Sequence, residues 1–308
     1  MKRKASFPFA FHSFFRNFAR MKQAMIFAAG LGTRLKPLTD TMPKALVPVG
    51  GVPLIDLVIR KLQSQGYDRF VVNVHHFAQQ IIDHVNASDY APLVQFSDET
   101  DGLLETGGGL KKAAPLFKDD EPILIHNVDI LDNVDYDWFS RQHLPDKDAV
   151  LLVSKRKTKR YLLFDNAMRL MGWMNVETGE VKSPYTWLRE SEFTIDEQWT
   201  VRAAANCFQR LSSRLGQTSK LDGSRCSDNS SLFTLHSSLH AMAFSGIHSF
   251  SPRLFTLMDQ FPDRFPIIDF YLSICHRSHI MGLVKDDLQV LDVGKLDSLS
   301  EAEAFIHI

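Results

Sequence analysis

The chain has 308 residues, of which 44% are hydrophobic, and its 35 Lys and Arg nearly balance its 36 Asp and Glu. The formal charge of −1 excludes a strongly basic nucleic-acid binder, which needs an excess of cations for its phosphate contacts. The apolar content excludes a highly charged disordered chain, and the length suits one large α/β domain or two small ones.

Residues 1–20 differ in composition from the rest of the chain. They hold five basic residues, no acid and six of the 23 Phe, so the remaining 288 residues carry a formal charge of −6. Polar residues interrupt this segment too often for a secretory signal. Three interpretations remain: translated sequence upstream of a start at Met21, a transit-like or surface-binding peptide, or an ordered helix. We favour the first, which places residues 1–20 outside the fold, because Met21 stands just before the first expected strand.

Cysteine usage and hydropathy bear on localisation. Cys207, Cys226 and Cys275 show no CxxC spacing, a pattern typical of a reduced compartment and not of a disulfide scaffold. The sequence contains no run of 18 apolar residues that could span a membrane. We therefore expect a cytoplasmic protein with no membrane or nucleic-acid partner.

From Ala24 onward, short apolar strands alternate with amphipathic helices. The predicted strands are 24–29, 70–74, 93–96, 122–127 and 149–153, and the predicted helices are 53–65, 78–85 and 106–116. Such alternation is typical of a doubly wound, mostly parallel sheet, so the predicted fold class is a Rossmann-like α/β domain.

After Ser154 this alternation ends. A basic run occupies 155–160, a hairpin is expected at 168–179, and 212–240 contains nine serines in 29 residues. The serine-rich stretch is interpreted as a mobile loop or lid, or as disorder. Regular structure is expected again in strands 241–247, 281–284 and 288–293 and in helices 252–259, 267–276 and 296–306.

A glycine-rich turn follows the first strand. Its residues Gly30-Leu31-Gly32-Thr33 allow backbone amides to approach an anion closely, and Arg34 and Lys44 add cations. The turn is not a Walker loop, and Leu35 takes the place of the last glycine of GxGxxG. With two cations beside it, the turn favours an anion site over a plain tight turn.

The segment Gly30–Val49, GLGTRLKPLTDTMPKALVPV, resembles the motif of the sugar-1-phosphate nucleotidyltransferases, GxGTRLxPLT followed by PKPLVPV. The resemblance continues through Asn73, QQI at 79–81, LETGGG at 104–109, Asn127-Val128-Asp129 and Asp292-Val293-Gly294. The LETGGG and QQI segments are most similar to N-acetylmuramate-1-phosphate uridylyltransferases of cell-wall recycling. Mannose-1-phosphate guanylyltransferases are near relatives.

The resemblance implies both a domain organisation and a reaction. A single nucleotide-diphospho-sugar transferase domain would span 21–308, with a nucleotide-binding half at 24–150 and a hairpin- and loop-rich sugar-phosphate half at 151–308. In the implied reaction, a sugar 1-phosphate attacks the α-phosphorus of a nucleoside triphosphate in line, and pyrophosphate leaves. Mg²⁺ is the implied cofactor, UTP the preferred nucleotide and GTP the alternative.

The resemblance also implies roles for single residues. Arg34 and Lys44 would be catalytic, and Asp129 and Asp292 would hold Mg²⁺, which prefers carboxylate oxygens. The nucleotide would be bound by Ala29, Gly30, Leu31, Gly32, Thr33, Gln79, Glu105, Thr106, Gly107 and Gly108. The sugar phosphate would be bound by Asn127, Phe244, Ser245, Gly246 and Asp269.

The LETGGG segment leaves two interpretations of its acid open. The Glu105 carboxylate could accept hydrogen bonds from uracil N3–H or from the ring and amino N–H groups of guanine, or it could cap the helix that starts at Thr106. Three glycines at a helix start cost stability, which favours a close approach of ligand at 107–109.

Two departures from the family pattern support a rival hypothesis. Val128 stands where glycine is usual, and the basic run follows Ser154 in place of an Asn-Pro pair. A regulatory protein that binds nucleotide without turnover is therefore a second hypothesis. A membrane-surface protein is a third, and it rests wholly on residues 1–20.

Overall fold

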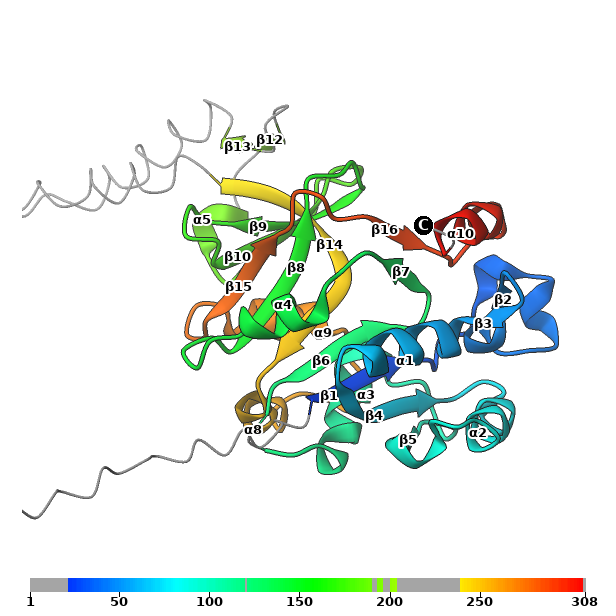
Figure 1. Cartoon of the computed structure of the whole chain (residues 1–308). Coiled ribbons are helices and arrows are strands. Elements are labelled where there is room, and N and C mark those ends of the chain that lie inside the picture. The colour runs from blue at the N-terminus through cyan, green and yellow to red at the C-terminus, as the bar shows by residue number, and fades with distance from the viewer. Residues whose placement is uncertain (1–21, 120, 190–192, 196–199, 204–238, 307–308) are drawn as a thin grey trace, which may run out of the picture.

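The computed structural model describes residues 22–119, 121–189, 193–195, 200–203 and 239–306 (Figure 1). Residues 1–20 and nearly all of 212–240 lie outside these ranges, so the interpretations of both segments stay predictions. Among the described helices, none combines the length and the hydropathy needed to cross a membrane.

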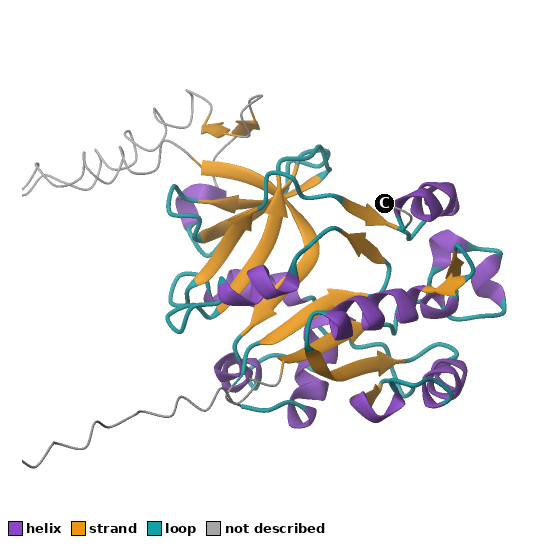
Figure 2. Cartoon of the chain, in the orientation of Figure 1, coloured by secondary structure: helices purple, strands orange, loops and turns teal. Residues whose placement is uncertain are grey.

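A mixed sheet of 12 described strands forms the centre of the molecule, with helices packed on its faces (Figure 2). One half of this sheet is parallel, as the sequence predicts. Its strands, in spatial order, are β6 (Ile123–Asn127), β1 (Lys22–Phe27), β4 (Tyr67–Val74) and β5 (Val94–Asp98). Parallel strands end at the same edge, so the segments that follow β1, β4, β5 and β6 meet there.

The other half of the sheet is organised by β14 (Leu239–Phe250), the long yellow strand of Figure 1. β14 pairs antiparallel with β6, with β8 (Ala149–Ser154) and with β9 (Arg160–Phe164). The predicted strand at 149–153 therefore does not join β6 directly, because β14 separates the two. The remaining strands of this half are β10 (Leu170–Asn175), β11 (Val181–Lys182), β12 (Phe193–Ile195), β13 (Thr200–Ala203) and β15 (Ile280–Val284).

Two small ladders, eight α-helices and seven short 3₁₀ turns complete the described structure. The ladders are β2 (Pro48–Val49) with β3 (Val52–Pro53), and β7 (Ile130–Asp132) with β16 (Val290–Asp292). The helices are α1 (Leu54–Ser64), α2 (Ala78–Asn86), α3 (Glu105–Ala113), α4 (Tyr136–Arg141), α5 (Thr186–Arg189), α8 (Phe255–Met258), α9 (Ile267–Ile274) and α10 (Leu299–Phe305).

Helix α1 shows how local sequence sets its limits. Pro53, with φ −55°, precedes its first turn, and Gly66, with φ +84°, lies just past its end. Proline suits the start of a helix and glycine its left-handed termination. Its stripe of apolar residues, from Leu54 to Leu62, is buried.

The parallel strands are buried on both faces. Ile26 of β1 packs in the same core cluster as Val58 of α1, whereas Met25 packs with Leu110 of α3 and Phe270 of α9. Neighbouring residues of a strand point to opposite faces, so a continuous apolar run is what a two-sided core requires. This burial holds the ends of the parallel strands in fixed positions.

A buried carboxylate ties α1 to β6 and β7. The side chain of Asp132 is 2% exposed and accepts hydrogen bonds from Lys61 Nζ at 2.5 Å and Tyr136 Oη at 2.8 Å. His126 Nε2 lies 3.2 Å from Asp132 Oδ2, the oxygen that also accepts from Tyr136. Burial raises the pKa of Asp132, but the hydrogen bonds and charges of His126 and Lys61 outweigh this effect and lower the pKa to about 2.

We expect Asp132 to make unfolding depend on acidity. Its ordinary pKa of 3.8 is lowered to about 2 by folding, so the ionised form stabilises the fold above pH 3.8. This contribution, about 2 kcal/mol, is lost as the pH falls from about 4 to about 2. Urea unfolding across this range should show a shallower pH slope for Asp132→Asn than for the native chain. Equal slopes would contradict the assignment.

Candidate active site

The turn after β1 is held by Asn73, near the end of β4. Its Oδ1 accepts hydrogen bonds from the amides of Ala28 at 2.7 Å and Ala29 at 3.3 Å. Gly32 has φ +63°, and a Cβ there would lie 2.8 Å from a Thr39 methyl carbon, so both backbone and space require glycine. The turn predicted to bind phosphate is therefore fixed by its neighbours before any ligand arrives.

Lys44 and Asp129 meet at this edge of the sheet. Lys44 opens a short 3₁₀ turn, Lys44–Leu46, and Asp129 lies between β6 and β7. Lys44 Nζ donates a hydrogen bond to Asp129 Oδ2, and the side chains are only 12% and 14% exposed. Two residues that the sequence singled out separately thus form one ion pair shielded from solvent.

Arg34 and Asp292 form a second, more open pair. The Arg34 guanidinium lies 3.6 Å from Asp292 Oδ2, and both side chains are about half exposed. The ladder of β7 and β16 places Asp292 beside Ile130, and the amide of Val293 donates to the Asp129 carbonyl at 2.8 Å. Asp292 is therefore anchored next to the residue that follows Asp129.

The two aspartates have the chemistry that Mg²⁺ requires. Asp129 and Asp292 offer hard carboxylate oxygens from adjacent segments. Within the described ranges, no group of three or more His, Cys, Asp or Glu side chains converges as a metal cage. A cation that takes only two carboxylates completes its shell with water and phosphate oxygens, as Mg²⁺ does beside nucleotides. The donor set fits this ion.

A cavity of about 370 Å³ lies beside the Lys44–Asp129 pair. Among its lining residues are seven of the predicted site residues, Ala29, Gly30, Lys44, Glu105, Thr106, Asn127 and Asp129. The other predicted residues are not part of this lining. The structure thus brings the first turn, the LETGGG segment and the end of β6 around one space of ligand size.

Glu99 is a lining residue to which the sequence gave no role. It follows β5 directly and is fully buried, and its Oε1 accepts from Asn73 Nδ2 at 2.7 Å. Its Oε2 accepts from the amide of Leu104 at 3.2 Å. Asn73 and Glu99 therefore connect the first turn to the LETGGG segment. A polar residue directly after a strand that neighbours the strand of Asn73 was the signal that could have identified Glu99.

Glu105 begins α3 in a strained conformation. Its φ of +62° is left-handed, which is rare for a residue other than glycine. Its Oε1 accepts from Arg264 Nε at 3.2 Å, and the amide of Phe265 donates to the Leu104 carbonyl. Such strain persists only where the surroundings fix the backbone, and it is common at ligand sites.

Gly107 and Gly108 are explained by packing of the protein against itself. Both amides donate to the carbonyl of Phe265, at 2.8 and 3.1 Å. A Cβ at Gly107 would lie 2.3 Å from the Phe265 ring, and one at Gly108 would lie 2.0 Å from the carbonyl oxygen of Asp263. Contacts within the protein therefore account for these two glycines without a ligand. Their contact with a nucleotide stays a prediction.

The FSGI segment forms a bulge in β14. The register with β8 shifts between Phe244 and His248, and the buried Ser245 hydroxyl donates to the Leu152 carbonyl at 2.8 Å. A Cβ at Gly246, where φ is +83°, would lie 2.8 Å from Asn127 Nδ2. The bulge thus places Gly246 against Asn127, while the Ser245 hydroxyl is directed into the sheet.

Two further predicted residues lie on helices and carry local partners. Asp269 of α9 lies 3.3 Å from Lys182 Nζ, and its side chain is 42% exposed. Gln79 of α2 is exposed, and its Nε2 donates to Asp83 Oδ1 at 2.7 Å. Neither lines the cavity, so their roles stay predictions.

Residues 23–161 match the family model described as nucleotidyl transferase, and this range contains the turn, Lys44, Asp129 and the whole cavity lining. This segment belongs to the nucleotidyl transferase family. The resemblance stated from the glycine-rich motif is therefore confirmed.

Curated relatives of the nucleotidyl transferase segment bear several substrate names. The N-acetylmuramate alpha-1-phosphate uridylyltransferase of Caulobacter vibrioides is 45% identical over 111 residues, which are 35% of this chain and 46% of that protein. A protein of the same name from Neisseria meningitidis is 41% identical over 115 residues, covering 37% and 49%. The mannose-1-phosphate guanyltransferase of Emericella nidulans is 32% identical over 134 residues, covering 42% and 36%. The chain thus spans about half or less of the length of these relatives.

Solved structures extend the fold beyond the matched segment. The inositol-1-phosphate CTP transferase from T. maritima has a TM-score of 0.63 at 13% identity and covers 93% of this chain and 95% of its own. HddC from Yersinia pseudotuberculosis, complexed with GMP-PN, has a TM-score of 0.56 at 21% identity, covering 93% and 100%. The predicted fold class, a Rossmann-like, doubly wound and mostly parallel sheet with a hairpin- and loop-rich subregion, is confirmed.

Proposed function

We propose that this chain is a sugar-1-phosphate nucleotidyltransferase, folded as one domain over 21–308 and acting in the cytoplasm. It would form a nucleotide sugar and pyrophosphate from a nucleoside triphosphate and a sugar 1-phosphate. The observation that carries this proposal is the meeting of the glycine turn, Lys44 and Asp129 at one cavity. Membership of residues 23–161 in the nucleotidyl transferase family supports it.

The proposed mechanism needs positioning and charge neutralisation and no covalent intermediate. The amides of Gly30–Thr33 and the Arg34 guanidinium hold the triphosphate, and its α-phosphorus faces the attacking sugar phosphate oxygen. Lys44 stabilises the charge that develops on the transferring phosphoryl group. Its bond to Asp129 fixes the ammonium in place and leaves two N–H donors for phosphate oxygens.

We assign Asp129 and Asp292 as the residues that hold Mg²⁺. When bound, the ion neutralises phosphate charge and orients the reacting groups. Lys44 and Arg34 each lie beside one of these carboxylates. The protein therefore presents two cations and two anions at this edge, an arrangement that favours a triphosphate with its metal over bare phosphate.

UTP with an N-acetylmuramate-type sugar 1-phosphate is the preferred substrate pair, and GTP with mannose 1-phosphate is the alternative. The names of the relatives from Caulobacter vibrioides and Neisseria meningitidis support the first pair. The test is pyrophosphate release with UTP and GTP, each combined with N-acetylmuramate, glucose and mannose 1-phosphates, in Mg²⁺. We expect UTP with N-acetylmuramate 1-phosphate to react fastest. Absence of turnover for every pair would reject the enzyme.

A regulatory protein that binds nucleotide without turnover is the second candidate, and Val128 and the missing Asn-Pro pair after Ser154 motivate it. Val128 is buried in the core, and its amide donates to the Phe27 carbonyl at 3.2 Å. It is not among the described residues with a left-handed backbone. Valine therefore replaces the usual glycine without strain, and this departure does not weaken the proposal that Asp129 holds Mg²⁺. Nucleotide binding by calorimetry without product would favour this second candidate.

A further inference from the structure

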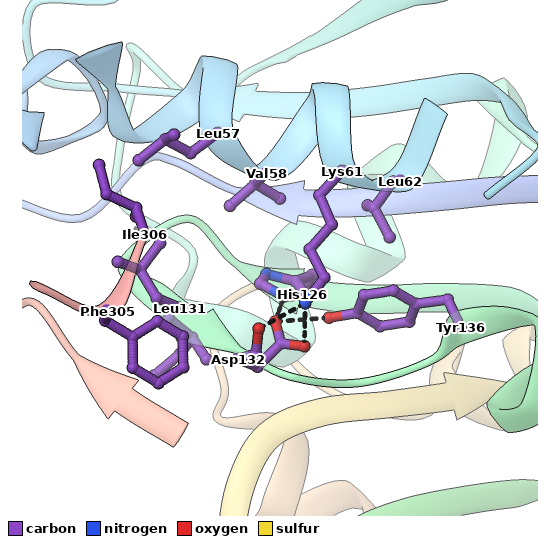
Figure 3. A pocket seen from close by; sticks show the side chains of 11 residues that line it. Leu57, Val58, Lys61, Leu62, His126, Leu131, Asp132, Tyr136, Phe305 and Ile306 are labelled. Carbon is purple, nitrogen blue, oxygen red and sulfur yellow. Dashed lines mark hydrogen bonds and ion pairs between the residues drawn. The ribbon is translucent and has the colours of Figure 1, made fainter. Parts of the chain in front are cut away.

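A second cavity, of about 270 Å³, lies between α1, β7 and α10 (Figure 3). Its walls are mostly apolar, with Leu57 and Val58 from α1, Leu131 from β7, and Phe305 and Ile306 at the end of the chain's last helix. One end is polar and contains Asp132 with its partners Lys61, His126 and Tyr136. Apolar walls with a few convergent polar groups are typical of small-molecule sites.

The Asp132 carboxylate at this polar end already has a hydrogen-bond partner at each of its acceptor sites. Asp132 Oδ1 accepts from Lys61 Nζ and from the amide of Val134, and Oδ2 faces Tyr136 Oη and His126 Nε2. Four donors fill the acceptor sites of one carboxylate. A cation or a hydrogen-bond donor therefore finds no free acceptor on Asp132.

Donor capacity remains on Lys61. Its Nζ donates to the carbonyl of Asp132 at 2.6 Å and to Oδ1 at 2.5 Å, which uses two of its three N–H groups. The side chain is 29% exposed and lies along the cavity in Figure 3. One charged N–H group is thus left for a ligand.

The other polar side chains at this end, Lys61, His126 and Tyr136, all face Asp132. His126 Nδ1 lies 2.8 Å from the Asn127 carbonyl and Nε2 lies 3.2 Å from Asp132 Oδ2, so both ring nitrogens face acceptors of the protein itself. Asp132, whose oxygens already accept four hydrogen bonds, is the one acid among the described lining residues. An ammonium N–H that lacks an acceptor is costly in an apolar enclosure, so this end favours a ligand that presents an anionic acceptor to Lys61.

We propose that this cavity binds a small monocarboxylate with an apolar body. The carboxylate accepts the remaining N–H of Lys61, and the hydrocarbon packs on Leu57, Val58 and Phe305. Residues of the segment 126–132 line both cavities, so the ligand lies behind the turn that carries Asp129 without using its carboxylate. This inference does not depend on the proposed transferase activity.

The test is calorimetric titration of the full chain with hexanoate, hexanamide and inorganic phosphate. Hexanoate should bind, whereas hexanamide lacks the charge and phosphate lacks the apolar body. We expect either of these to bind at least roughly tenfold more weakly, because a charge-assisted hydrogen bond and several buried methylenes are each worth that much. Equal binding of hexanoate and phosphate, or no binding of hexanoate, would overturn the proposal.

Three variants locate the ligand. Lys61→Met should weaken hexanoate binding by roughly tenfold or more, because it removes the donor and the charge. Arg60→Met is the matched control, because Arg60 lies on the same helix but pairs with Asp89 outside the cavity. Leu57→Trp should weaken binding by filling the cavity without changing any charge. Binding unchanged by both Lys61→Met and Leu57→Trp would overturn the site.

Discussion

Lys44→Met is expected to reduce the turnover number for pyrophosphate release by about a hundredfold or more, the loss typical of removing one charged group that stabilises a transition state. The reason is that Lys44 is the shielded cation beside the cavity and pairs with Asp129. Its methylene stem is retained in methionine, so the change removes charge and hydrogen bonding with little loss of packing. Steady-state kinetics at saturating substrates measures the effect, and circular dichroism verifies the fold.

Lys36→Met is the control for this loss. Lys36 lies eight residues earlier but is 60% exposed and pairs with Asp40 on the surface. Its replacement should change turnover by less than roughly twofold, as expected for an exposed ion pair. A Lys44→Met variant with the native turnover number would remove Lys44 from the mechanism.

Gly108→Ala is expected to lower the free energy of unfolding by about 3 kcal/mol, the upper part of the usual range for overpacking a core position. Its added Cβ would lie 2.0 Å from the carbonyl oxygen of Asp263, a backbone atom that cannot rotate away. Segment 263–266 must then move from α3, and the hydrogen bonds to the Phe265 carbonyl weaken. Urea unfolding measures the loss.

Gly102→Ala is the matched control for Gly108→Ala. A Cβ at Gly102 would meet no atom within 4 Å, and its backbone is not left-handed. Its stability should change by less than about 0.5 kcal/mol, as for most exposed substitutions. If Gly108→Ala were as stable as Gly102→Ala, the packing explanation of the LETGGG glycines would be wrong.

Local sequence was sufficient for the elements whose causes are local. The apolar run at 24–29 predicted β1 because a strand buried on both faces needs no alternation, and Pro53 and Gly66 marked the ends of α1. The insertion of β14 between β6 and β8 could not be predicted in this way. Its pairing joins segments about a hundred residues apart, and strand periodicity carries no information on the partner.

The same distinction between local and distant causes applies to the candidate site. The glycine turn and its cations were identified from residue chemistry, and the roles of Asp129 and Asp292 came from the family resemblance. The packing role of Gly107 could not be predicted because the ring that crowds it, Phe265, comes from a distant segment. Glu99 was missed because its importance lies in hydrogen bonds to Asn73 and Leu104 that only the folded chain forms.

The most direct test of the central claim is phosphorus NMR of the full chain with UTP, N-acetylmuramate 1-phosphate and Mg²⁺. We expect the two coupled phosphorus resonances of a nucleoside diphosphate sugar to appear together with an equal amount of pyrophosphate. The Asp129→Asn variant should yield neither product. Unchanged UTP and sugar phosphate, with GTP and the other sugar 1-phosphates equally unreacted, would contradict a nucleotidyltransferase active site at this cavity.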